Sequence, residues 1–337
     1  MTDEADDLRA PAPPADAVST ASARPAAIAV RAALAVACLG VALWVAVTRW
    51  TTLLAGHPAY PALLGVIALV GVAIGVRSRR ARAGGALRTT GRVVGTVVLL
   101  LVLAAAVWLR PYAADPVAVA ATATSADVDG VHTAGSWELR PRGTAAGAGV
   151  VFYPGALVDP RAYLALLRPL AEQGHVIVVV NAPFDVALLA PGAVTAAFDA
   201  HPEVRTWAVG GHSLGGLPAS TAAAGGGARV RGLFLWASYP AQSIADAPVA
   251  ALSVSGDRDG LTTPADVAAS RALLPPGTTF TVVQGGVHAY FGDYGPQTGD
   301  GEPTLSRAEA QRQIVTATEE FLAGLATTPD APGELPR

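Results

Sequence analysis

The sequence predicts a chain in two parts: three membrane-spanning helices, followed by an α/β domain with a mostly parallel sheet. Three long runs without a charged residue in the first third of the chain predict the helices. Further on, short apolar runs alternate with helical patterns, which is typical of a parallel sheet with helices on both faces. The composition fits this division. Only 15% of the 337 residues are charged, whereas a soluble domain carries roughly 25%.

The N-terminal residues 1–27 are rich in alanine, proline and aspartate and have no apolar period, so we predict a disordered tail. The membrane region is predicted over residues 28–112, with helices at about 32–48, 59–76 and 93–109. Each run lies near the lower limit of roughly 17–25 residues for a spanning helix. The alternative is a set of buried core helices, but three successive charge-free runs are hard to place in one core.

The distribution of arginines predicts the orientation in the membrane. Six of them crowd into the loop between the second and third runs: Arg77, Arg79, Arg80, Arg82, Arg88 and Arg92. The positive-inside rule places this loop and the N-terminus in the cytoplasm, and everything after Leu109 on the outer side. The cluster is interpreted as a topology signal or a contact to anionic lipid. A net charge of −3 gives no reason to expect a nucleic-acid partner.

The rest of the chain is predicted to hold a linker over 113–145, one folded domain over 146–326 and a disordered tail over 327–337. The linker is rich in Ala, Thr, Asp and Gly, and a short hairpin around 135–139 is the alternative there. The predicted strands are 149–153, 175–181, 206–210, 232–237, 249–255 and 279–283, and the predicted helices are 161–173, 213–224, 264–274 and 306–325.

The pentapeptide Gly-His-Ser-Leu-Gly at 211–215 stands between a predicted strand and a predicted helix. In that context Gly-x-Ser-x-Gly predicts a sharp turn that presents Ser213 as a nucleophile above the sheet edge. The backbone N–H of Leu214, at the start of the helix, is then the first candidate donor to an oxyanion. The alternative is a glycine-rich turn in which Ser213 is an ordinary helix cap.

A serine nucleophile needs a base, and histidine suits proton transfer near neutral pH. His288 is the candidate among six histidines, because it follows the last predicted strand in a loop that contains glycine. The third member is a carboxylate that orients the imidazole. The loop after the strand 249–255 offers Asp259, which we favour, and Asp257 as the alternative. The order Ser213, Asp259, His288 is that of one particular fold.

Residues 148–325 resemble the α/β-hydrolases, in particular the compact dienelactone-hydrolase-like esterases. The resemblance is carried by the motifs at 211–216, 255–264 and 285–295. It implies the α/β-hydrolase fold and a second oxyanion donor after the first strong strand, the N–H of Ala156. The turn that holds Ala156 lacks the His-Gly signature common in such enzymes. Dienelactone hydrolases use a cysteine where this chain has Ser213, so their activity does not carry over.

The predicted site is open, since only about a dozen residues separate the strands 232–237 and 249–255, too few for a large lid. The segment 291–301 is expected to support His288, with pocket lining as the alternative. No cofactor is expected, and no metal, because Asp293, Asp300 and Glu302 lack a ligand spacing. Candidates for an apolar acyl-binding wall are Phe184, Leu188, Leu189, Trp236 and Tyr239.

The sequence therefore predicts a multi-pass membrane protein with a serine hydrolase domain on the outer side. The expected reaction is hydrolysis of a carboxylic ester, from a small molecule or a lipid, through an acyl-enzyme on Ser213. One alternative is an envelope acyltransferase, because an alcohol accepts the acyl group through the same intermediate. The other is a non-catalytic module, whose hallmark would be a missing triad member.

Overall fold

The computed structural model describes residues 15–78, 86–143 and 147–327. The first 14 residues and residues 328–337, where disordered tails are predicted, lie outside this part. The described chain divides into two compact units. The first unit holds the chain up to Thr48 and the segment Pro61–Leu109. The second unit holds the segment Arg49–Tyr60 and the chain from Arg110 onward.

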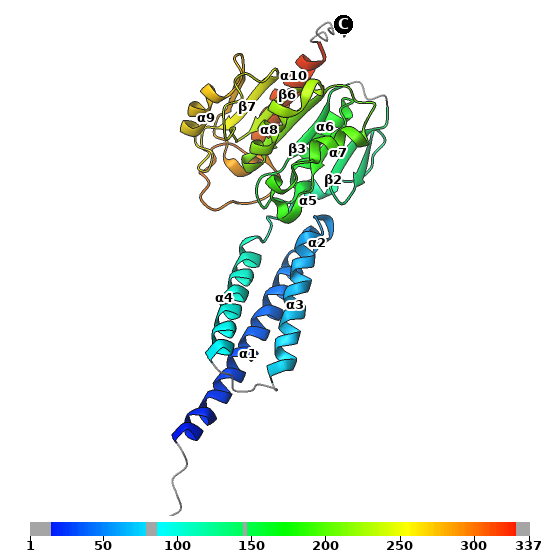
Figure 1. Cartoon of the computed structure of the whole chain (residues 1–337). Coiled ribbons are helices and arrows are strands. Elements are labelled where there is room, and N and C mark those ends of the chain that lie inside the picture. Colours follow the sequence, from blue (N-terminus) through cyan, green and yellow to red (C-terminus); the bar gives the residue numbers. More distant parts are fainter. Residues whose placement is uncertain (1–14, 79–85, 144–146, 328–337) are drawn as a thin grey trace, which may run out of the picture. The chain divides into compact units, whose positions relative to one another are not determined.

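The first unit consists of three long helices: α1 (Ala15–Thr48), α3 (Ala59–Ser78) and α4 (Ala86–Trp108) (Figure 1). Each contains a stretch long and apolar enough to cross a membrane, with a mean hydropathy of 2.2. The tail predicted over residues 1–27 is corrected in part, because α1 already begins at Ala15. The first turns of α1 are rich in alanine, the residue with the highest helix propensity, which explains the longer helix.

Small side chains hold the three helices together. Cys38 and Ala42 of α1 pack with Ile67 of α3 and with Leu103 and Ala106 of α4. Most other large apolar side chains of these helices are exposed. In a soluble helix bundle the large apolar side chains face inward. Here they face outward, as in helices that are surrounded by hydrocarbon.

The second unit is built on an eight-stranded sheet with the order β1-β2-β4-β3-β5-β6-β7-β8. The first two strands pair antiparallel and the other six run parallel. This confirms the predicted mostly parallel sheet. The strands are β1 (Val128–His132), β2 (Ser136–Pro141), β3 (Gly149–Tyr153), β4 (Ile177–Val180), β5 (Trp207–His212), β6 (Val230–Trp236), β7 (Ala250–Gly256) and β8 (Thr279–Val283).

The prediction of a linker over 113–145 is wrong for most of its length. This stretch contains the short helix α5 (Pro116–Ala120) and the strands β1 and β2. β2 pairs with β4, with Ser136 opposite Val180 and Leu139 opposite Ile177. The alternative of a short hairpin is confirmed, since β1 and β2 pair antiparallel with His132 opposite Trp137. β2 also depends on β4, a partner strand some forty residues further along, of which local composition gives little sign.

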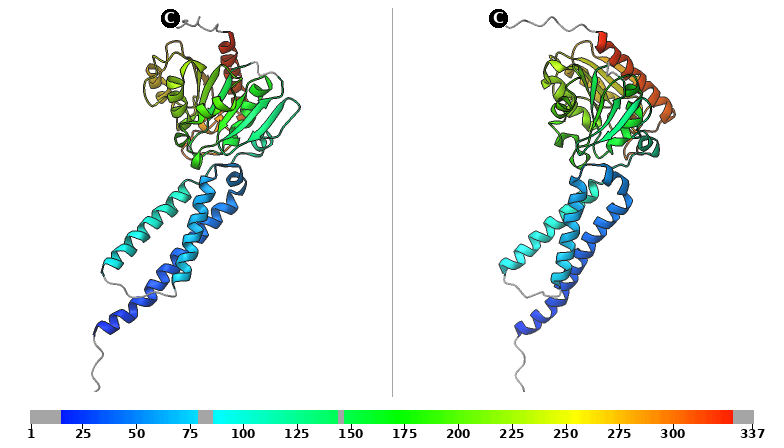
Figure 2. Two further views of the ribbon diagram at one scale, coloured as in Figure 1. Left: turned by 45° about the vertical axis from the view of Figure 1, so that its right-hand side comes forward. Right: turned by 90° about the vertical axis from the view of Figure 1, so that its right-hand side faces the viewer.

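Helices cover both faces of the sheet (Figures 1 and 2). Against one face, α6 (Leu164–Glu172) and α10 (Arg307–Thr327) bury Leu167, Ile314 and their neighbours on Phe152 and Phe234. Against the other, α7 (Ala193–Ala200) and α8 (Gly216–Gly225) pack on the side chains that alternate with these along the strands. The remaining helices of this unit are α2 (Trp50–Ala55) and α9 (Pro264–Ser270).

Candidate active site

Ser213 follows β5 directly and opens a 3₁₀ turn, η4 (Ser213–Gly215), which leads into α8. Its φ of 52° lies in the left-handed region, which a residue other than glycine rarely adopts. The flanking glycines are required by close backbone approach. A Cβ on Gly211 would lie 2.3 Å from the carbonyl oxygen of Gly215, and one on Gly215 would lie 2.1 Å from that of Tyr153. The Gly-x-Ser-x-Gly pattern is thus explained by steric fit at both glycines.

Unusual backbone conformations gather at one edge of the sheet. All five residues other than glycine with positive φ in the described chain come shortly after the carboxyl end of a strand. They are Leu157 after β3, Phe184 and Asp185 after β4, Ser213 after β5 and Ala237 after β6. Strained conformations of this kind cluster at functional sites, and parallel sheets place their sites at this edge.

His288 and Asp259 meet at the same edge. Asp259 follows β7, His288 follows β8, and His288 Nδ1 lies 2.8 Å from Asp259 Oδ2. The other oxygen, Oδ1, accepts hydrogen bonds from the backbone N–H groups of Leu261 at 2.8 Å and Thr262 at 2.7 Å. Both side chains are buried. Among the described residues, His288 Nε2 has no hydrogen-bond partner, which leaves this nitrogen open to accept a proton.

The structure brings Asp259, not Asp257, to the imidazole. Asp257 Oδ1 instead accepts a hydrogen bond from the N–H of Gly285 at 2.5 Å, at the turn after β8. Of the two aspartates that the sequence leaves open, Asp257 thus ties two loops together, and Asp259 orients the histidine.

Asp300 holds the loops that carry Asp259 and His288. Its carboxylate accepts from the N–H groups of His288 at 3.0 Å and Ala289 at 2.8 Å. It also accepts from the N–H of Gly301 at 2.8 Å and from the N–H of Gly260, in the loop that carries Asp259, at 3.3 Å. The sequence predicts that the segment 291–301 supports His288, and Asp300 is the residue of that segment that bonds its backbone N–H.

His212, the residue before Ser213, lies beneath the imidazole of His288. The two ring centroids are 4.6 Å apart, and Tyr163 Oη lies 2.8 Å from His212 Nδ1. Tyr163 Oη accepts the N–H of Gly155, so its own proton points to Nδ1. Burial lowers the pKa of His212 well below its ordinary value, and the charge of His288 lowers it further. The lowered pKa favours the neutral form of His212, which packs against the ring of His288. No sequence pattern predicted this contact.

In the turn after β3, two of three successive backbone N–H groups are hydrogen-bonded and the one between them is not. The N–H of Gly155 is taken by Tyr163, and the N–H of Leu157 by the carbonyl of Asp185 at 2.8 Å. In the described part of the chain, the N–H groups of Ala156 and Leu214 have no acceptor. Both predicted oxyanion donors therefore lie in turns at the carboxyl edge of the sheet with their N–H groups unengaged.

The carboxyl group of Asp185 lies behind this turn. Burial raises its pKa well above the ordinary value, the carboxylate of Asp159 raises it further, and Arg161 opposes the shift. Arg161 is already paired with Asp159 at 2.6 Å. The shift favours the neutral form of Asp185, which reduces negative charge beside the turn that holds Ala156.

Comparison with known proteins identifies the unit that carries this site. Residues 149–313 match the model of the alpha/beta hydrolase family. The second unit has the α/β-hydrolase fold. No curated protein matches the chain.

Solved structures similar to the chain include three bacterial proteins. An esterase from Thermogutta terrifontis is 12% identical, with a TM-score of 0.42 over 56% of this chain and 87% of its own. A putative dienelactone hydrolase from Klebsiella pneumoniae is 15% identical, with a TM-score of 0.42 over 57% of this chain and 92% of its own. Est1E from Butyrivibrio proteoclasticus is 15% identical, with a TM-score of 0.44 over 60% of this chain and 100% of its own.

The apolar wall expected beside the site of the hydrolase domain is only partly available. Trp236 belongs to the core, where it packs on Phe152 and donates from Nε1 to Thr318 Oγ1 at 3.1 Å. Leu188, Leu189 and Tyr239 are exposed, and the turn η3 (Ala187–Leu189) lies against η4, which begins at Ser213. Within the residues that the structure describes, no group of histidine, cysteine and acidic side chains could hold a metal ion.

Proposed function

We propose that this chain is a membrane-anchored serine hydrolase that cleaves carboxylic esters through an acyl-enzyme. One observation carries the proposal. The buried Asp259–His288 pair ends in an unpartnered Nε2, at the sheet edge where Ser213 is presented on a strained turn. This is the set of groups that acyl transfer to serine requires.

In the proposed reaction, Ser213 Oγ approaches His288 Nε2 when an ester binds, and the imidazole takes its proton as Oγ attacks the carbonyl carbon. Asp259, held by two backbone N–H groups, keeps the proton on Nδ1 and stabilises the imidazolium. The imidazolium then protonates the leaving alkoxide. Water attacks the acyl-enzyme by the same route in reverse, which releases the acid and restores Ser213.

The N–H groups of Leu214 and Ala156 would stabilise the tetrahedral oxyanion. Two features support them: neither has an acceptor among the described residues, and Leu214 stands in the turn that precedes α8. Loss of one such donor typically costs about 10²–10³ in turnover. His212 and Asp300 act through His288, so we class both as positioning residues.

The substrate we propose is an ester with an apolar acyl group, from a small molecule or a lipid. The exposed Leu188 and Leu189 next to η4 provide a surface for such a group. The residues between β6 and β7 form no helix, so no lid from this connection covers the site.

We further propose that the three apolar helices span a membrane, with the N-terminus cytoplasmic and the hydrolase domain outside. Two facts support this arrangement. The arginine-rich loop follows α3, and the segment Arg49–Tyr60 between the first two spans belongs to the same compact unit as the hydrolase domain. Three spans require these two parts to lie on the same side.

A fluorophosphonate probe, which labels activated serines, tests the proposed nucleophile in the full-length protein. We expect labelling of the parent chain and of Ser253→Ala, a control at a buried serine on β7. Ser213→Ala should lose labelling and about 10⁶-fold in turnover of a chromogenic ester. Labelling of folded Ser213→Ala contradicts the assignment. Product formed only with an added alcohol would make the enzyme an acyltransferase, with Ser213 retained.

A protease confined to the outer face tests the orientation. Cleavage should occur after residue 109 and spare the loop between α3 and α4. Protection of the hydrolase domain in sealed vesicles would contradict the proposed topology.

A further inference from the structure

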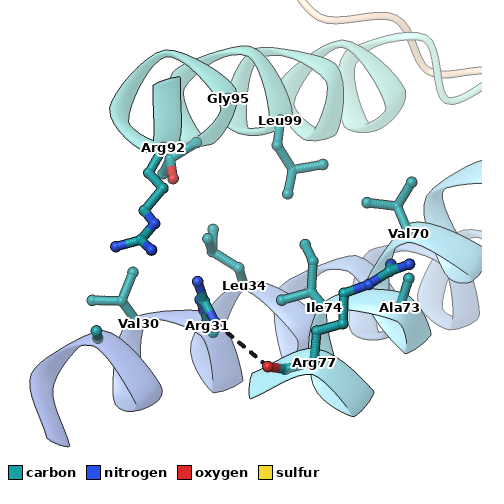
Figure 3. Close-up of a pocket in the computed structure, with 12 residues that line it drawn as sticks. Val30, Arg31, Leu34, Val70, Ala73, Ile74, Arg77, Arg92, Gly95 and Leu99 are labelled. Atoms are coloured by element: carbon teal, nitrogen blue, oxygen red, sulfur yellow. Dashed lines mark hydrogen bonds between the residues drawn. The ribbon is translucent and has the colours of Figure 1, made fainter. Parts of the chain in front are cut away.

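The three apolar helices differ at their two ends. At one end Arg31 donates to the carbonyl of Arg77 at 3.4 Å, and the helices line a cavity of about 780 Å³ (Figure 3). At the other end, the chain that leaves α1, enters α3 and leaves α4 belongs to the second unit, as Arg49–Tyr60 and the chain from Arg110 onward. The unit with the hydrolase fold therefore includes chain that directly adjoins all three helices.

Tyr112, a few residues beyond the end of α4, is bonded to the turn that holds Ala156. The N–H of Tyr112 donates to the carbonyl of Leu157 at 2.7 Å, and its carbonyl accepts from the N–H of Asp159 at 3.0 Å. These bonds form a parallel bridge between Tyr112 and Val158. The turn is thereby attached, on both sides of Val158, to the chain that leaves the third apolar helix.

Arg49, the residue directly after α1, bonds the peptide group that precedes Tyr112. Its Nε donates to the carbonyl of Pro111 at 2.7 Å. That carbonyl and the N–H of Tyr112 belong to one peptide group, because Pro111 precedes Tyr112. A charged donor on the carbonyl polarises the peptide group, which strengthens the hydrogen bond that its N–H makes with Leu157. Arg49 thus acts on the turn through Pro111 and Tyr112.

Tyr60, in the first turn of α3, supports the other hydrogen bond of Leu157. The N–H of Leu157 donates to the carbonyl of Asp185 at 2.8 Å. The ring of Phe184, one residue earlier, lies edge-on to that of Tyr60, with centroids 6.3 Å apart. Leu157, Phe184 and Asp185 have φ values of 59°, 57° and 53°, and such conformations persist only where surrounding contacts fix them. The buried ring of Tyr60 provides one of these contacts.

We propose that Arg49, Tyr60 and Tyr112 are positioning residues for the second oxyanion donor. The proposal rests on the serine hydrolase function proposed above, in which the N–H of Ala156 is that donor. The next residue, Leu157, has both its N–H and its carbonyl engaged, and the residue before Ala156 donates its own N–H to a buried tyrosine hydroxyl at 2.9 Å. With both neighbours fixed, the N–H of Ala156 is oriented before the substrate binds. A donor that is already oriented stabilises the oxyanion without reorganisation.

Steady-state kinetics of the full-length protein in mild detergent tests this role. Arg49→Met and Tyr60→Leu should each lower kcat for a chromogenic ester about tenfold, with KM changed less than about twofold, because the oxyanion forms only in the transition state. Arg49→Lys and Tyr60→Phe keep the donor and the ring and should recover most of the rate. Arg142→Met, the same change at an exposed arginine paired with Asp129, should leave kcat unchanged.

A trifluoromethyl ketone separates positioning of the donor from a general loosening of the fold. Ser213 Oγ adds to its carbonyl carbon, the hydroxyl proton passes to His288, and the carbonyl oxygen becomes an oxyanion like that of the transition state. Its inhibition constant should rise about tenfold in Arg49→Met and in Tyr60→Leu, as kcat falls. Titration with the fluorophosphonate probe gives the concentration of active sites, so both constants refer to folded protein.

Two results would overturn the positioning role. One is an unchanged kcat in both folded variants, and the other is a lower kcat with an unchanged inhibition constant for the ketone. A parent chain that hydrolyses the ester distinguishes these results from a failure of the proposed function. If the parent chain were not labelled at Ser213, the proposed function would be contradicted together with the positioning role.

Discussion

The two units of this chain use apolar residues in opposite ways. In the hydrolase domain, every side chain of β3 and β4 is buried, and the exposed surface carries most of the charge. In the helical unit, at most 22% of the residues in each apolar window are buried, and valines and leucines point outward. The same residue types thus face the interior in one unit and the exterior in the other. A position's tolerance to change depends on which unit holds it.

The largest difference concerns catalysis, which we assign wholly to the hydrolase domain. Asp259→Asn should lower turnover of an ester by about 10⁴-fold, because the imidazole loses the group that fixes its tautomer. Asp257→Asn, two residues away, should lower turnover less than about tenfold, since it bonds Gly285 and not His288. Steady-state kinetics of the full-length variants measures both. An equal loss of turnover in the two variants would contradict the specific role of Asp259 and show that either change disturbs the whole loop.

The second difference concerns charge on an exposed position. Leu101 on α4 is 65% exposed, and Thr316 on α10 is exposed as well. Leu101→Asp should cost about 2.5–3.5 kcal/mol of membrane insertion, because the carboxylate would face hydrocarbon. Thr316→Asp should change stability by less than about 0.5 kcal/mol in water.

The inserted fraction after membrane extraction measures the first of these variants, and the unfolding midpoint measures the second. Full insertion of Leu101→Asp would show that α4 does not face lipid at this position.

The smallest effect is the response of the hydrolase domain to acid. Burial lowers the pKa of both His175 and His212, so the folded state keeps them neutral where the unfolded chain takes up protons. The unfolding free energy should therefore fall as the pH drops below about 6.5, by at most about 1.4 kcal/mol per pH unit for each histidine. Thermal unfolding of the detergent-solubilised protein between pH 8 and pH 5 measures this slope.

His212→Asn provides the comparison for that slope. Its amide oxygen still accepts from Tyr163, but the side chain does not titrate, so the pH dependence should become shallower. An unchanged slope would assign the acid sensitivity to other groups.

Several elements were predictable because their signals are local. β3 and β8 have the bounds that their apolar runs predict, since each is a short run rich in β-branched and aromatic residues next to turn signals. The sharp turn at Ser213 was predictable because two glycines flank it in a strand-to-helix context. The sequence favoured Asp259 over Asp257 but left both open, because the contact that engages Asp257 depends on where the turn after β8 places Gly285.

Other features depend on contacts between distant residues and left no local signal. β1 has one fully buried residue, Val128, and depends on its pairing with β2. His212 supports His288 only because β5 and the loop after β8 meet in the folded sheet. α7 was missed because it is only eight residues long and half of them are alanine, so the sequence marks no clear apolar face.

The segment Arg49–Tyr60 has a consequence for the order in which the chain folds. Trp137 donates from Nε1 to the carbonyl of Ala55 at 3.0 Å, and Arg49 donates to the carbonyl of Pro111 at 2.7 Å. The ribosome makes Ala55 before two of the three long apolar helices, yet its partner on β2 emerges 82 residues later. This part of the hydrolase domain therefore completes its contacts only after both of those helices have been made. A fragment that begins at residue 113 would lack both of these hydrogen bonds.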